Sequence, residues 1–154
     1  MKSIQAVRRG QDLPALDATA ANGDRYNNTE VRQTAQGWEL TLHGHKILAR
    51  GRVKVILREG AAPVYCDTLT IDLCGWNTVT TRDRLNRFLP NPLGVYNHKR
   101  VPYLGGIALA PSERGLELPT HCALVIYDHP DYGWIVRGET LSGFSAWKSE
   151  AAAV

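Results

Sequence analysis

The sequence predicts an α+β fold, with a mainly antiparallel, curved β-sheet and one prominent short amphipathic helix at about residues 80–89. Apolar and polar side chains alternate through several segments between residues 38 and 73, which is the pattern of strands with one buried face. The segment after them instead has apolar residues at helical spacing and ends at two prolines. Alternating strands joined by short turns favour antiparallel pairing.

We expect a flexible N-terminal arm over residues 1–28 and a single α+β domain over residues 29–154. The arm is rich in Ala, Asn, Asp and Gln, contains Pro14 and Gly23, and shows no sustained hydrophobic period. With 154 residues the chain is long enough for one hydrophobic core but short for two independent domains.

Four segments alternate apolar and polar side chains and are expected to be strands: residues 38–42, 47–49, 52–58 and 64–73. Turns are expected at Gly44 and Gly60, because glycine readily adopts turn conformations. Gly51 is expected to separate the second strand from the third, since a glycine inside a strand pattern often marks a break.

The helix at about residues 80–89 has one apolar face at i, i+3 and i+4, formed by Leu85, Phe88 and Leu89. Thr80 or Thr81 is expected to cap its first turn through the side-chain hydroxyl, with Asp83 as a capping-box partner of Thr80. On a helical wheel Arg84 and Arg87 point away from the apolar face. The helix is therefore expected to present two guanidinium groups to solvent or to a partner.

After the helix, short strands are expected over residues 93–96 and 101–104. Residues 121–127 are almost wholly apolar, so they are expected to form a central strand buried on both faces, with residues 134–136 paired beside it. Trp147 is expected to anchor the C-terminal segment.

Composition is that of an ordinary globular protein, with 44% apolar and 21% charged residues. The longest apolar run, residues 122–127, is too short to cross a bilayer, and nothing near the N-terminus resembles a signal peptide. We therefore expect no membrane association and a cytoplasmic location. Cys66, Cys74 and Cys122 match no metal or redox motif and are expected to be free buried thiols.

Charge is distributed unevenly along the chain, although the net charge is only +3. Residues 36–100 hold ten Lys and Arg against five Asp and Glu, whereas residues 101–154 hold three against six. A basic face is therefore expected in the middle of the chain.

Two motifs in this middle region resemble one family. Residues 42–49 read Leu-His-Gly-His-Lys-Ile-Leu-Ala, and residues 75–86 contain Gly-Trp-x-Thr-x-Thr-Thr-x-x-Arg-Leu-Asn. Together they resemble a family of small uncharacterised proteins of tailed bacteriophages, over about residues 36–90. The resemblance implies a phage gene product in the host bacterial cytoplasm and implies no particular activity.

The basic surface is the leading candidate site. Its cations could neutralise phosphates while Trp76, Tyr96 and Tyr103 stack on exposed bases. The candidate residues for binding nucleic acid or a partner are Arg52, Lys54, Arg58, Trp76, Thr78, Arg84, Arg87, Lys99 and Arg100. A structural interpretation stays open, because basic strand faces are often only solvated and glycine, threonine and asparagine in the Trp76 motif suit turns and caps.

No metal site, cofactor or catalytic centre is expected. His43, His45 and His121 could join the cysteines as zinc ligands, but the spacing matches no zinc motif. The sequence contains no phosphate-binding loop, nucleophile elbow or H-E-x-x-H. Residues 128–131, Asp-His-Pro-Asp, could supply a general base, but a polar turn uses the same residues.

We therefore expect a non-enzymatic phage accessory protein that binds nucleic acid, DNA or RNA, through a basic helix and strand surface. One alternative is a protein-binding effector that inhibits or redirects a host enzyme or defence system. Another is a virion or assembly component that self-associates as a homo-oligomer.

Overall fold

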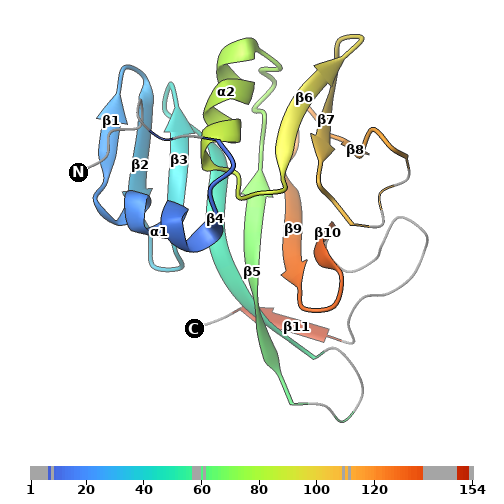
Figure 1. Cartoon of the computed structure of the whole chain (residues 1–154). Coiled ribbons are helices and arrows are strands. Elements are labelled where there is room, and N and C mark those ends of the chain that lie inside the picture. Colours follow the sequence, from blue (N-terminus) through green and yellow to red (C-terminus); the bar gives the residue numbers. More distant parts are fainter. Residues whose placement is uncertain are drawn as a thin grey trace.

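The computed structural model describes residues 7, 9–56, 60, 62–108, 110, 112–136 and 149–152. These residues form an α+β fold in which most of the chain is antiparallel sheet (Figure 1). The elements are, in order, α1 (Leu13–Ala21), β1 (Asp24–Tyr26), β2 (Thr29–Gln33), β3 (Trp38–Leu42), β4 (His45–Ile56), β5 (Val64–Ile71), α2 (Val79–Phe88), β6 (Gly94–His98), β7 (Val101–Gly105), β8 (Leu116–Glu117), β9 (Leu124–His129), β10 (Gly133–Val136) and β11 (Ser149–Ala152). The fold class predicted from the sequence is confirmed.

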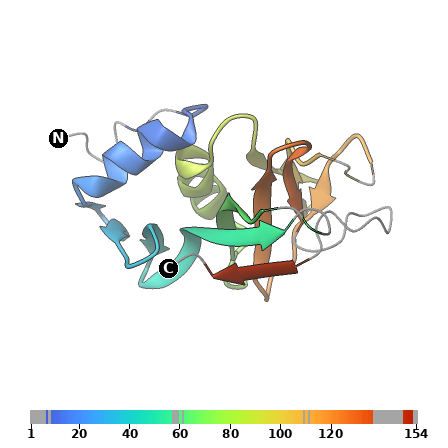
Figure 2. The same cartoon turned by 90° about the horizontal axis from the view of Figure 1, so that it is seen from below.

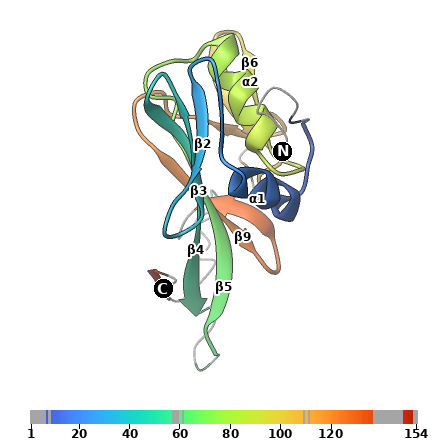
Figure 3. The ribbon, with the colours of Figure 1, turned by 90° about the vertical axis from the view of Figure 1, so that its left-hand side faces the viewer.

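The strands form two sheets. The larger is curved and open, with the order β1-β2-β3-β4-β5-β9-β10, and β11 pairs with the end of β4 that β3 leaves uncovered. Figure 2 shows β11 running alongside β4. The smaller sheet has the order β6-β7-β8. Figure 3 shows α1 and α2 on the same face of the larger sheet.

Strand β4 is continuous through Gly51, so the predicted break at this residue is wrong. Gly51 pairs in register with Thr68 of β5. A Cβ atom at position 51 would lie 3.0 Å from the Thr68 hydroxyl oxygen, so glycine here permits a close approach between the two strands. The result is a strand of 12 residues that links the two ends of the molecule.

Helix α1 lies inside the segment predicted to be a flexible arm, and for these residues that prediction is wrong. The Asp12 side chain accepts a hydrogen bond from the Ala15 N–H at 3.0 Å, and Pro14 stands in the first turn, where its missing N–H is not needed. Leu16 and Ala20 are fully buried against the sheet. An aspartate cap followed by proline was the local signal for this helix.

The main hydrophobic core lies between the two helices and the larger sheet. Trp38 and Phe88 meet edge to face, with ring centroids 5.8 Å apart. The predicted apolar face of α2 is buried here as expected. Besides these two aromatics, the core includes Leu16, Leu40, Leu48, Leu69, Ile71, Leu73, Leu85, Leu89 and Ile126.

Strand β9 starts at Leu124, so the predicted central strand over residues 121–127 is shifted. His121 and Cys122 are exposed, and next to them the Thr120 carbonyl accepts from the Gly75 N–H in the loop before α2. Strands β5, β6, β7 and β10 lie close to their predicted positions. Trp147 lies outside the described residues.

The three cysteines are free, as predicted, but only Cys66 is buried. Cys74 is half-buried and Cys122 is exposed. None of the helices in the described part of the chain is long and apolar enough to cross a membrane.

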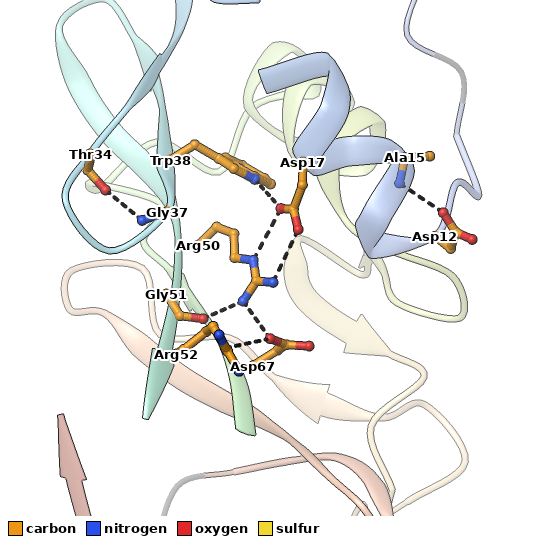
Figure 4. Close-up of polar contacts among 10 residues, drawn as sticks. All are labelled: Asp12, Ala15, Asp17, Thr34, Gly37, Trp38, Arg50, Gly51, Arg52 and Asp67. Carbon is orange, nitrogen blue, oxygen red and sulfur yellow. Dashed lines mark hydrogen bonds and ion pairs between the residues drawn. The ribbon is translucent and has the colours of Figure 1, made fainter. Parts of the chain in front are cut away.

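Arg50 of β4 joins α1 to two strands (Figure 4). Its Nε and Nη2 atoms each lie 3.2 Å from an Asp17 carboxylate oxygen, and its Nη1 atom lies 2.9 Å from Asp67. The Trp38 indole N–H donates to the same Asp17 carboxylate at 2.6 Å. Burial opposes the charged form of this arginine, yet bonds to the two carboxylates raise its pKa above the usual value.

Asp17→Ala is expected to lower the free energy of unfolding by about 2–3 kcal/mol, because it leaves a nearly buried guanidinium and an indole N–H without their shared acceptor. Urea unfolding measures this change. Arg32→Ala is the control, since the side chain of Arg32 is 62% exposed where it pairs with Glu39, and about 0.5 kcal/mol or less is expected. Equal effects of the two substitutions would contradict the role given to Arg50.

Candidate functional site

Two segments far apart in the sequence line one pocket of about 230 Å³. One is the β3–β4 hairpin and the other is the loop that leads from β5 into α2. The lining residues are Leu42, His43, His45, Ile47, Leu73, Cys74, Trp76, Thr78, Thr80 and Thr81. The two motifs singled out in the sequence therefore meet at one place.

The β3–β4 turn places a histidine at the edge of this pocket. Leu42 pairs with His45, so His43 and Gly44 form a two-residue turn, and both have positive φ, at 52° and 77°. This is the backbone of a type I′ turn, which suits the right-handed twist of the strands. The His43 ring stacks against the Trp76 ring, with centroids 6.3 Å apart and an interplanar angle of 27°.

A left-handed turn before α2 directs Trp76 outward. Cys74 and Gly75 have φ values of 53° and 79°, and the Asp72 carboxylate accepts a hydrogen bond from the Cys74 N–H at 2.8 Å. A Cβ atom at Gly75 would lie 3.2 Å from the His121 ring. Trp76 is 54% exposed, which is unusual for so large an apolar side chain.

Thr78 caps α2, so the predicted caps Thr80 and Thr81 are wrong. The Thr78 hydroxyl accepts from the Thr81 N–H at 3.2 Å and lies 3.0 Å from the Thr81 hydroxyl. The helix starts one residue earlier than predicted, and Asp83 takes no part in the cap. Thr78 therefore has a structural role, while Thr80 remains exposed at the rim of the pocket.

Asn77 connects the Trp76 loop to the β6–β7 hairpin. Its side-chain amide donates to the side-chain oxygen of Asn97 at 2.9 Å and to the Arg100 backbone carbonyl at 3.5 Å. The side-chain carbonyl oxygen of Asn77 accepts from Arg82. Figure 1 shows the β3–β4 turn, the start of α2 and the tip of the β6–β7 hairpin together at the top of the molecule.

Lys99 and Arg100 form the tip of that hairpin. His98 pairs with Val101, so these two residues are the whole turn, and their φ values are 49° and 67°. Both side chains are exposed. We call the site made by His43, Trp76, Lys99 and Arg100 the upper site.

Arg84 and Arg87 do not present free guanidinium groups, so the predicted basic face of α2 is wrong. Arg84 Nη1 and Arg87 Nε lie 2.6 Å and 3.1 Å from the same Asp83 carboxylate oxygen. Arg84 Nε also donates to the Thr29 hydroxyl at 2.9 Å. Arg84 thereby ties α2 to β2, whereas the contact between Arg87 and Asp83 lies within the helix.

Arg52 and Lys54 lie on the other half of β4. They are seven and nine residues along the strand from His45, which corresponds to about 23–30 Å. Arg52 pairs with Asp67 at 3.7 Å and lies over the Tyr65 ring at 4.8 Å. Arg58 lies outside the described residues. The predicted continuous basic surface is therefore divided, and Arg52 and Lys54 form a separate lower patch.

Tyr96 and Tyr103 also lie away from Trp76. Side chains alternate along β6, so Tyr96 faces the side opposite Asn97, which contacts the Trp76 loop. The two tyrosine rings stack on each other at 5.7 Å, and the Tyr96 hydroxyl donates to the Arg114 carbonyl.

The side chains considered as metal ligands or as a general base have the following surroundings. Among the described residues, no three His, Cys, Asp or Glu side chains are grouped to hold a metal ion. His129 is 2% exposed, and its Nδ1 accepts from the Asp131 N–H at 3.0 Å. Burial and the nearby charge of Asp67 raise the pKa of Asp128. The Asp-His-Pro-Asp segment thus builds the β9–β10 turn.

The sequence analysis predicted only some residues of the upper site as candidates. Trp76, Lys99 and Arg100 were candidates, but His43 was considered only as a metal ligand. The hydrophobic periodicity of the sequence does not indicate the hydrogen bond between Asn77 and Asn97, which are 20 residues apart. The left-handed turns at His43–Gly44 and Cys74–Gly75 were the signals that two loops bend towards one point.

No protein-family model, curated protein or solved structure matches this chain.

Asp83→Asn is expected to destabilise the protein in a pH-dependent way. Burial alone would raise the pKa of Asp83, but its arginine neighbours hold the pKa below the usual value. The ionised carboxylate therefore stabilises the fold above the unfolded-state pKa of about 4, and this stabilisation is lost as pH falls through the folded-state pKa. We expect a loss of about 1–3 kcal/mol at neutral pH that shrinks below about pH 4.

Urea unfolding of wild type and variant at several pH values measures this difference. Glu117→Gln, at an exposed carboxylate of β8, is the control and should change the free energy of unfolding by about 0.5 kcal/mol or less. A difference for Asp83→Asn that stays constant with pH would contradict the assignment.

Proposed function

We propose that this protein is a non-enzymatic accessory protein that binds single-stranded nucleic acid, DNA or RNA, through the upper site. The resemblance to phage proteins supports a role in the cytoplasm of a host bacterium. The observation that carries the proposal is a pair of exposed cations held in a strained turn beside an exposed tryptophan.

The strain in this turn supports a functional role. Lysine and arginine in the left-handed region each cost about 1–2 kcal/mol, whereas Asn-Gly adopts the same type I′ turn readily. The β3–β4 hairpin of this protein does use glycine at its second turn position. A strained Lys99-Arg100 pair at the β6–β7 tip is therefore poor for stability, and such strain is typical of binding sites.

The chemistry of the upper site fits an unpaired strand. An exposed indole can stack on an unpaired base, which contributes about 1–3 kcal/mol, and any base offers such a face. Two exposed cations can contact phosphates of the same strand. In duplex DNA or RNA the base faces are already stacked, so Trp76 would contribute little to binding a duplex.

The small number of cations sets the expected salt dependence. Arg84 and Arg87 of α2 are paired to Asp83, Arg82 is bonded to Asn77 and the lower patch is distant, so we assign only Lys99 and Arg100 to phosphates. Two phosphate contacts on a single strand give a slope of about −1.4 in log affinity against log salt. Affinity should then fall about seven-fold between about 50 and 200 mM salt.

Lys99→Asn combined with Arg100→Gly is expected to change stability and binding in opposite directions. It relieves the strained turn, so the free energy of unfolding should rise by about 1–2 kcal/mol. It also removes both phosphate contacts, so affinity for a labelled single strand of about 12 nucleotides should fall about five-fold or more at low salt. Urea unfolding and fluorescence anisotropy measure the two effects.

Arg52→Ala combined with Lys54→Ala is the matched control, because it removes two exposed cations from the lower patch. We expect it to leave affinity within about two-fold and to leave the salt slope unchanged. Equal losses in the two double variants would indicate nonspecific charge attraction. Absence of strand binding at low salt, together with capture of a bacterial protein, would favour the protein-binding alternative.

A further inference from the structure

We propose that the pocket of the upper site takes one nucleobase, inserted between the rings of His43 and Trp76. This inference rests on the proposed function, since the base would reach the pocket as part of a bound strand. It goes further because it assigns a pocket, a ligand class and a second stacking residue.

The two rings lie close to parallel beside the pocket, as two faces that hold a base must. Their centroids are 6.3 Å apart and their planes differ by 27°. Stacked bases are separated by about 3.4 Å, so a base between two rings needs about 6.8 Å. The stacked rings must therefore move apart to admit a base, which is feasible because His43 lies in an exposed turn and Trp76 is half-exposed.

The size and lining of the pocket also suit a small planar ring. Its volume of about 230 Å³ lies below the range of about 300–1,000 Å³ that is usual for larger organic ligands. Leu42, Ile47 and Leu73 supply buried apolar surface. Threonine hydroxyls at the rim, with Thr80 exposed, can donate to or accept from the edge of a base.

The charge around the pocket is compatible with a polyanion. No Asp or Glu is among the described residues that line it. The Asn77 side chain holds the loop that carries Trp76 against the Arg100 backbone, so the phosphates next to an inserted base would pass close to the β6–β7 tip. Base and phosphate contacts thus belong to one continuous path.

The variant His43→Asn distinguishes insertion of a base between His43 and Trp76 from stacking of a base on Trp76 alone. It removes one ring of the pair and creates Asn-Gly, the residue pair that best fits a type I′ turn, so the hairpin should fold at least as well. Thermal unfolding checks this. The probes are an oligothymidylate of about eight nucleotides and an abasic sugar–phosphate strand of equal length.

We expect His43→Asn to weaken binding of the intact strand about five-fold or more and to change binding of the abasic strand by less than about two-fold. Equal effects of His43→Asn on the two strands, or no effect on either, would overturn the base-pocket inference. In that case, binding of the intact strand by the wild-type protein would still support the proposed function. Tyr65→Ala, at an exposed tyrosine of the lower patch, is the control and should affect neither strand.

A second readout covers the case in which no strand binds. Saturable quenching of tryptophan fluorescence by nucleoside monophosphates, lost in Trp76→Phe and reduced in His43→Asn, would support the base pocket although the proposed function has failed. Absence of both strand binding and quenching would overturn the two proposals together.

Discussion

Carboxylates hold most of the described arginines of the central region in fixed positions, and this pairing decides which cations remain at the surface. Arg50 is clamped between Asp17 and Asp67, which seats α1 on the sheet. Within α2, Asp83 pairs with Arg84 and Arg87, and Arg84 also donates to the Thr29 hydroxyl of β2. Once these pairs are satisfied, the exposed cations near the pocket include Lys99 and Arg100 at the β6–β7 tip and Lys46, which lies between the lining residues His45 and Ile47. Ion pairs that stabilise the fold therefore also narrow the candidate binding surface to one end of the molecule.

The upper site depends on turns more than on regular structure. Three loops bend sharply through left-handed residues: His43–Gly44, Cys74–Gly75 and Lys99–Arg100. Asn77 bonds the Cys74–Gly75 loop to the Lys99–Arg100 hairpin. The stacked rings of His43 and Trp76 join the Cys74–Gly75 loop to the His43–Gly44 turn. Because the loops start from paired strands and from the capped end of α2, the exposed side chains are held on a rigid base.

Periodicity predicted the strands and α2 because each of these buries one face along its own length. It missed α1, which is alanine-rich and is marked mainly by the Asp12 cap and Pro14. The sequence pattern also predicted a break in β4 at Gly51, where the glycine instead allows close contact with Thr68. For the site, a helical wheel assigned Arg84 and Arg87 to solvent. It could not include Thr29, the partner of Arg84 that lies 55 residues away, and it left out the pairing of Arg87 with Asp83 one turn earlier. Local sequence alone proposed Trp76 and the Lys99-Arg100 turn as candidates, but their proximity depends on tertiary contacts.

Nuclear magnetic resonance mapping of the ¹⁵N-labelled protein with a short single strand would test the location of binding most directly. Added strand should shift the indole signal of Trp76 and the backbone amides of residues 43–45 and 97–101. The indole of Trp38, which is buried and bonded to Asp17, and the amides of Arg52 and Lys54 should stay in place. Shifts confined to the lower patch, or no shifts at low salt, would contradict the account.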